Sequence, residues 1–366
     1  MRTVNTWTGR EARALRQALR FSVRAFAEHL GVAIRTVSKW ESNGGSRHPQ
    51  PTMQAALDTV LAHASADERA RFEDLTNLSE TIPYSALPSQ SWSRDDWTDD
   101  LDRARLCASQ QNFALASRLT ERWLIRTDTG KLEEQDLHLR GRTLMLLGDV
   151  SRDQGRLLGP GSAVSAYRQA LRIFNCMKAE RRTAQIELLL TVVLEMSGEL
   201  ERSARRYREL APDPRLGAID RARAQLWIGT ALTKAPSSGG VEKVAAVEAI
   251  ESAITQFEEL DEPEEWKVAH QKLALAHLAL DRRDAAHRHI DIAMTDSAVV
   301  TPLQQVKLGT ARGHILLSEG TTRSEGMTTL ERCRELAVAN QLAHQVASID
   351  RIVGSAQGQA AQRKVS

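Results

Sequence analysis

The sequence is poor in cysteine and has no long hydrophobic run. Its three cysteines, Cys107, Cys176 and Cys333, lie far apart, without the spacing of a disulfide framework or of a metal-binding motif. We therefore expect reduced, buried thiols. The longest apolar run, around residues 188–194, is too short to cross a bilayer, and no apolar signal core precedes Trp7. These absences predict a soluble, cytoplasmic protein that has no membrane partner.

Aromatic residues are also scarce, at 4% of the 366 residues, whereas Ala, Leu, Arg and Glu dominate. This mixture favours helices over strands. A chain of this length buries a substantial core and has room for two or three domains. The composition therefore predicts an all-α fold.

Charge is distributed unevenly along the chain, although the net charge is only +2. Residues 1–63 hold nine Lys and Arg against four Asp and Glu, and the remainder has a small acidic excess. A basic N-terminal head on a weakly acidic body suggests that the head alone meets a polyanion such as DNA.

The stretch from Ser22 to Glu41, SVRAFAEHLGVAIRTVSKWE, has the pattern of two short helices joined by a glycine turn. Ser22 is placed to cap the first helix, and Gly31 supplies the turn. Val37 and Trp40 are three residues apart, so both face inward from the second helix. The opposite side of that helix is then available for the major groove of DNA.

Further short helices are predicted around this pair. Residues 9–20 form one, and Pro51 opens another. A fifth helix begins at the capping-box spacing Ser65-x-x-Glu68. We therefore expect a compact five-helix domain over residues 1–75.

This domain resembles the Cro/C1-type, or XRE, helix-turn-helix family. The resemblance is carried by Ser22, Phe26-Ala27, Leu30-Gly31-Val32 and the run from Arg35 to Glu41. In that family the second helix of the motif reads the operator, which implies here that Ala33, Ile34, Arg35, Ser38 and Lys39 face the groove.

The contacts to the phosphate backbone depart from the family pattern, because Val23 stands where many members carry a glutamine. Other residues then have to supply these contacts. The predicted DNA-binding residues are Arg16, Ser22, Arg24, Ala33, Ile34, Arg35, Ser38, Lys39, Asn43 and Arg47.

Residues 76–94 contain two prolines and several Ser and Thr residues, which predicts a linker. Four hydrophobic side chains within it suggest that it lies against a neighbouring surface. They are Ile82, Tyr84, Leu87 and Trp92.

From residue 95 onward the sequence repeats, with small residues 44, 43, 38, 45 and 39 positions apart at Ala104, Gly148, Thr191, Gly229, Ala274 and Gly313. Small residues let stacked helices approach closely. Residues 95–341 are thus predicted to form about six helix pairs, which resemble tetratricopeptide repeats most clearly at residues 196–210. Residues 342–366 are expected to form a capping helix to about Ser355, followed by a frayed tail.

In tetratricopeptide repeats the first helices of the pairs line a concave groove. The resemblance places the groove of this chain at Arg142, Asp149, Arg152, Gln185, Glu195, Arg223, Thr230, Gln271, Lys307 and His314. Such polar residues can hold an extended peptide or another effector, with solvated helix surface as the alternative for each of them.

Other polar clusters in the sequence do not indicate catalysis or metal binding. His287 and His289 are two positions apart and point in different directions on a helix, so they do not converge with His277 on a metal. The aspartates at 95–102 suit a helix start and lack the spacing of a calcium loop. No phosphate loop or nucleophile motif is present, so we predict neither a cofactor nor an enzyme.

A Cro/C1-type head followed by tetratricopeptide-like repeats resembles the Rgg and PlcR type of peptide-sensing regulator from Gram-positive bacteria. The resemblance implies a homodimer that binds double-stranded DNA, regulates transcription, and senses a peptide, small molecule or protein partner through the repeats. Two alternatives remain open. One is a protein-interaction scaffold with weak DNA binding, and the other is an antitoxin-like repressor that binds the product of a neighbouring gene.

Overall fold

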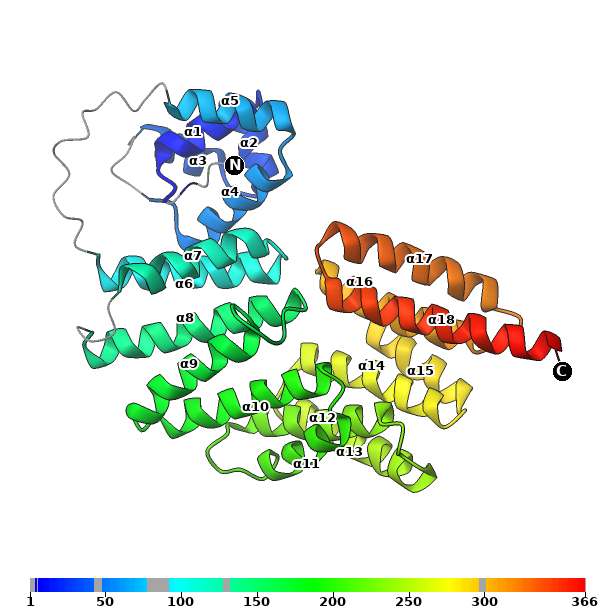
Figure 1. Cartoon of the computed structure of the whole chain (residues 1–366). Helices are drawn as coiled ribbons and strands as arrows, with labels where there is room; N and C mark the ends of the chain where they lie inside the picture. Colours follow the sequence, from blue (N-terminus) through cyan, green and yellow to red (C-terminus); the bar gives the residue numbers. More distant parts are fainter. Residues whose placement is uncertain are drawn as a thin grey trace. The chain divides into compact units, whose positions relative to one another are not determined.

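The computed structural model of the chain describes residues 4, 6–42, 48–77, 92–127, 132–295 and 301–365. Every regular element in these residues is a helix, which confirms the predicted all-α fold (Figure 1). The chain divides into two compact units, Met1–Leu147 and Gly148–Ser366, and the division falls within one helix. None of the helices in the described residues is long and apolar enough to cross a membrane.

The first unit contains the helix-turn-helix motif and the helices that pack around it. Its helices are α1 (Gly9–Ala18), α2 (Val23–His29), α3 (Ile34–Ser42), α4 (Pro51–His63), α5 (Ala66–Asn77), α6 (Arg94–Ser109), α7 (Phe113–Arg126) and most of α8 (Glu134–Asp153). The Ser22 hydroxyl accepts a hydrogen bond from the Ala25 N–H (3.1 Å), which confirms the predicted cap of α2. Reciprocal hydrogen bonds between Ser65 and Glu68 confirm the capping box before α5.

The core of the N-terminal five helices is built from large side chains on each of them. Leu15, Phe26, Val37 and Leu57 are fully buried, and the rings of Trp7 and Phe72 lie 5.9 Å apart at their centroids. Gly31 has φ +67°, a left-handed conformation that glycine adopts without strain, and it forms the predicted turn between α2 and α3.

A buried ion pair joins α4 to α6. The guanidinium of Arg103 donates from Nη2 to Asp58 Oδ1 and from Nε to Asp58 Oδ2, each over 2.5 Å. Trp7 Nε1 donates to the same carboxylate (2.5 Å), and Arg103 also donates to the carbonyl of Val4 (3.1 Å). The side chains of Arg103 and Asp58 are 1% and 2% exposed. We call this group the Asp58–Arg103 cluster.

Three tryptophans fill the space between α6 and α7. Trp97 and Trp123 stack at 5.4 Å, and Trp92 meets both rings edge-on. Trp92 therefore lies against a neighbouring surface, as predicted. The other hydrophobic residues of the predicted linker, Ile82, Tyr84 and Leu87, lie outside the described residues.

The second unit continues the series of helix pairs. It holds the end of α8, then α9 (Ala163–Cys176), α10 (Glu180–Met196), α11 (Leu200–Leu210), α12 (Ala218–Lys234), α13 (Gly240–Glu259), α14 (Pro263–Ala279), α15 (Arg283–Met294), α16 (Pro302–Leu317), α17 (Arg323–Ala339) and α18 (Ala343–Val365). The expectation that helix α18 ends near Ser355 is wrong, because its backbone stays helical to Val365.

In two of the pairs, close packing depends on a glycine of the first helix. A Cβ added at Gly148 would come within 2.4 Å of the Tyr167 ring. One added at Gly229 would come within 2.5 Å of the Ala246 carbonyl and of Ile250. The predicted role of these two glycines in close helix approach is thereby confirmed.

Candidate DNA-binding helix and ligand cavity

Helix α3 buries one side and exposes the other. Val37 is fully buried and Trp40 is 8% exposed, whereas Ile34 is 48% exposed. The residues predicted to face the groove all lie on the exposed side, namely Ala33, Ile34, Arg35, Ser38 and Lys39. The predicted inward and outward faces of this helix are confirmed, and DNA contact by the outward residues stays a prediction.

The exposed side of α3 carries the chemistry that base recognition uses. Arg35 can offer two parallel N–H donors to guanine, Lys39 can reach guanine or phosphate, and Ile34 can contact a thymine methyl. Within the described part of the chain, neither Arg35 nor Lys39 forms an ion pair. Both charges therefore remain available to a bound duplex.

Arg16 holds α3 in place from behind. Its Nε and Nη2 atoms donate to the two carboxylate oxygens of Glu41 (2.6 and 2.9 Å), and Nη1 donates to the Phe21 carbonyl (2.9 Å). The Arg16 side chain is only 13% exposed. Internal acceptors occupy its guanidinium and tie α1 to α3, and the prediction that Arg16 contacts phosphate stays a prediction.

The other predicted backbone-contact residues differ in their surroundings. The Arg24 side chain is 77% exposed, and its Nε lies 3.6 Å from Glu28 Oε1 within the same helix. This weak exposed contact leaves the Arg24 side chain accessible to a phosphate. Ser22 is exposed while its hydroxyl caps α2. Asn43 and Arg47 lie outside the described residues.

The second unit contains a cavity of 570 Å³, and the term cavity refers to this site from here on. The first helices of the pairs, α8, α10, α12, α14 and α16, supply most of its lining, and α18 adds His344 and Gln345. The predicted groove residues found in this lining are Asp149, Arg152, Glu195, Arg223, Thr230, Gln271 and Lys307. Their part in binding a ligand stays a prediction.

Three predicted groove residues do not line the cavity. Arg142 belongs to the first unit. Gln185 Nε2 donates to Asp220 Oδ2 (2.7 Å), which fixes its side chain between α10 and α12. His314 is close to the C-terminal end of α16, where burial lowers its pKa.

The sequence prediction missed several side chains that line the cavity, notably Trp227, Lys234, Lys272 and His344. Burial, reinforced by the positive charges of Lys234 and Lys307, lowers the pKa of Lys272 to about 7. Burial also lowers the pKa of His344. Lys272 directly follows the predicted Gln271, so a prediction that included the sequence neighbours of each groove residue would have included Lys272.

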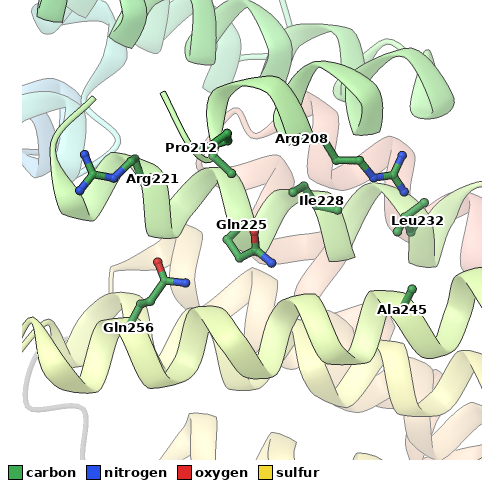
Figure 2. Close-up of a pocket in the computed structure, with 9 residues that line it drawn as sticks. Arg208, Pro212, Arg221, Gln225, Ile228, Leu232, Ala245 and Gln256 are labelled. Atoms are coloured by element: carbon green, nitrogen blue, oxygen red, sulfur yellow. The ribbon is translucent and has the colours of Figure 1, made fainter. Parts of the chain in front are cut away.

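A second hollow, of 460 Å³, lies on α11, α12 and α13 and is lined partly by the opposite side of α12 (Figure 2). Figure 2 shows Arg208 and Arg221 at separate ends of it, with Ile228 and Leu232 on the α12 side. Arg221 already donates to the Leu216 carbonyl (2.6 Å). None of these residues was among the predicted site residues.

The histidines of α14 and α15 pack against one another. His289 stacks on both His270 and His277, with ring centroids 5.2 Å apart in each case. His287 Nε2 instead lies 2.8 Å from Glu319 Oε1. Among the described residues, no three His, Cys, Asp or Glu side chains are arranged to hold a metal.

Comparison with known proteins identifies the N-terminal domain. Residues 7–72 match the family model of a helix-turn-helix domain. No curated protein sequence matches the chain. The predicted helix-turn-helix domain is therefore confirmed by a family match that covers the head alone.

Solved structures that resemble the whole chain include two Rap proteins. A Rap protein in complex with competence and sporulation factor is 15% identical, with a TM-score of 0.50 over 96% of this chain and 99% of that one. The Rap conjugation gene regulator of plasmid pLS20, in complex with a Phr peptide, is 12% identical, with a TM-score of 0.50 over 91% and 98%. PlcR of Bacillus thuringiensis, in complex with the peptide PapR7 and DNA, is 11% identical over 78% of this chain and 94% of its own, and its TM-score of 0.37 is too low to indicate a shared overall fold.

At such low identity the likeness to the Rap proteins concerns the fold alone. It agrees with the series of stacked helix pairs and with the spacing of small residues along the chain. The protein thus consists of an N-terminal helix-turn-helix domain followed by tetratricopeptide-like helical repeats with a Rap-like fold.

Proposed function

We propose that this chain is a sequence-specific DNA-binding transcription regulator, and that its repeats dimerise and sense a peptide, small molecule or protein partner. The observation that carries the proposal is the construction of α3. Buried Val37 and Trp40 and the Arg16–Glu41 pair hold this helix from one side, while Arg35 and Lys39 project from the other. A helix that is packed against the domain on one face and exposes basic side chains on the other is suited to the major groove of DNA.

Dimerisation follows from the size of the DNA-binding surface. One helix-turn-helix head covers a single half-site, and useful affinity usually requires two heads on a two-fold operator. We therefore expect a homodimer in solution, which analytical ultracentrifugation of the full chain would detect. A strictly monomeric chain that still binds a two-fold operator tightly would contradict this part of the proposal.

The cavity supports the sensing part of the proposal. Its volume of 570 Å³ lies within the range of about 300 to 1,000 Å³ that small-ligand sites occupy. The Rap proteins of similar fold are described in complex with a Phr peptide and with competence and sporulation factor, which supports a peptide as one class of effector. A ligand would act by favouring one of two arrangements of the dimer, to the extent that its affinity differs between them.

Selection of binding sites from random duplexes at a salt concentration of about 150 mM tests the DNA-binding part, because a basic head binds any DNA at low salt. We expect enrichment of a two-fold site. Arg35→Ala should cost about 1–3 kcal/mol at one base position and relax specificity there. Arg168→Ala, which removes an exposed arginine from α9 in the repeats, is the matched control and should bind as the wild type does. Failure to enrich any site would contradict the proposal and favour a protein-interaction scaffold.

A further inference from the structure

Almost all the charge that lines the cavity is neutralised internally. Each carboxylate of the lining has a cation close by: Arg152 lies beside Asp149 (2.9 Å) and Asp153 (3.0 Å), Lys234 beside Glu195 (2.6 Å), Lys267 beside Glu264 (3.9 Å), and Arg223 beside Glu265 (2.5 Å). Every acidic side chain of the lining is therefore in an ion pair. Two lysines of the same cavity remain.

Lys272 of α14 and Lys307 of α16 are those two. Across the described residues neither ammonium group forms an ion pair or a hydrogen bond. The backbone carbonyl of Lys307 accepts a hydrogen bond from Gln271 Nε2 (2.7 Å), which ties α16 to α14 beside these side chains. A half-buried cation without a partner reduces the stability of the fold, which suggests that these lysines have a role other than stabilisation.

The electrostatics of the cluster agree with a missing anion. Lys234 and Lys307 repel the charge of Lys272, and burial also lowers the pKa of Lys307. Among the described residues, Glu195 favours the charged form of Lys272, and Asp153 and Glu265 favour that of Lys307. Glu195 is already shared between Lys234 and the hydroxyl of Tyr207, which donates to it over 3.0 Å.

The first turn of α18 completes this part of the cavity. Gly155, with φ +79°, follows α8 and lies so close to α18 that a Cβ there would come within 3.3 Å of the His344 backbone nitrogen. This approach brings residues 155 and 344 together and places His344 in the lining. A neutral imidazole at that position can add a hydrogen bond to an anion that two lysines attract.

We propose that the ligand of the cavity carries an acidic group, a carboxylate or a phosphate, and that this group binds Lys272 and Lys307 beside His344. The inference rests on the proposed function, because it names the chemistry of the effector that the repeats sense. It also explains the unpaired lysines, since the ligand supplies the partner that the chain itself omits.

Thermal unfolding of the full chain tests this inference. Inorganic phosphate and acetate are compared with chloride at equal ionic strength, so that general screening is the same in all three. We expect phosphate or acetate at about ten times its dissociation constant to raise the Tm of the wild type by about 2–4 °C. The larger response of the two identifies phosphate or carboxylate chemistry as the one preferred.

The variants separate a specific site from a general salt effect. Lys272→Met with Lys307→Met should have a higher Tm than the wild type in chloride and should no longer respond to phosphate or acetate. Lys267→Met removes a lysine from the same cavity that is paired with Glu264, and it should keep the response. An equal response in the double variant and the wild type, or no response in the wild type, would overturn the inference.

Two further results keep the test decisive. If the double variant does not fold, each single variant should bind phosphate or acetate about tenfold more weakly than the wild type in calorimetry, and unchanged binding would overturn the inference. The charge-preserving Lys272→Arg should retain most of the response. None of these assays contains DNA, so they are independent of the proposed function. A protein that selects an operator but does not respond to phosphate or acetate refutes this inference alone. A protein that responds to one of these anions but selects no operator refutes only the proposed function.

Discussion

The Asp58–Arg103 cluster of the first unit and the cavity of the second unit use cations in opposite ways. Arg103 is buried with acceptors from Asp58 and Val4 around it. Lys272 and Lys307 are half-buried and have no such acceptor among the described residues. A buried charge whose partners are all internal contributes to structure, whereas one without an internal partner indicates a place where a ligand completes the site.

The largest effect that tests this comparison is the loss of one partner in the Asp58–Arg103 cluster. Asp58→Ala leaves Arg103 buried without its carboxylate and should lower the free energy of unfolding by about 3–5 kcal/mol, measured by urea denaturation. The control, Asp102→Ala, removes an exposed carboxylate 3.9 Å from Arg105 and should change stability little. Similar losses in the two variants would show that the cluster is not a structural pair.

Arg16 offers a smaller version of the same test at the edge of the head. Arg16→Ala removes a two-pronged pair with Glu41 and should cost about 1.5–3 kcal/mol of stability, because its hydrogen bonds involve charged groups. It should also weaken specific and non-specific DNA binding together, by loosening α3. A variant that keeps wild-type stability but loses one phosphate contact would instead support the original prediction for Arg16.

Removal of an unpaired lysine should raise the stability of the fold, whereas the two substitutions above lower it. The pKa of Lys272 is about 7 in the folded chain against an ordinary value of 10.5, so the folded state disfavours its charged form. The resulting cost to stability is complete below pH 7 and disappears as the pH rises toward 10.5. The charged groups that face Lys272 are Lys234, Lys307 and Glu195, and burial also lowers the pKa of Lys307.

Lys272→Met should therefore raise the Tm most below pH 7, and the gain should shrink as the pH rises. Thermal unfolding of the variant and the wild type at about pH 6 and about pH 9 measures the difference. A variant that is less stable than the wild type at both pH values would show that Lys272 makes a stabilising contact.

The smallest expected effect on stability comes from an exposed pair in the head. Arg24→Ala removes a contact of 3.6 Å to Glu28 between two largely exposed side chains, so the Tm should not change measurably. DNA binding should weaken evenly across sequences, and the slope of affinity against salt should fall by about 1. An unchanged slope would exclude Arg24 from the phosphate contacts.

Local patterns predicted the parts of this molecule that depend on neighbours in sequence. The spacing of Val37 and Trp40 gave the buried side of α3, and hence its exposed side. The small residues at 148 and 229 gave two positions where paired helices approach closely. For α3, helix periodicity determines which side chains share a face. For the two glycines, the spacing of the repeats gives the positions.

Features that join distant residues could not be predicted in this way. The pairing of Asp58 with Arg103 is one such feature, because the two residues are 45 positions apart in the sequence. The resemblance to tetratricopeptide repeats placed Gln271 and Lys307 in a groove, and both line the cavity, but it did not give the contribution of α18. His344 enters the lining through the approach of α18 to Gly155, which depends on how successive helix pairs curve.

The most direct test of the difference between paired and unpaired charge is the pKa of the Lys272 ammonium in the full chain. It can be followed by NMR of the lysine side chains, with Lys272→Met used to assign the signal. We predict a value of about 7 without added anion, and a rise toward the ordinary value of 10.5 when phosphate or acetate binds. A value near 10.5 under both conditions would contradict the claim that the cavity leaves this charge for a ligand to neutralise.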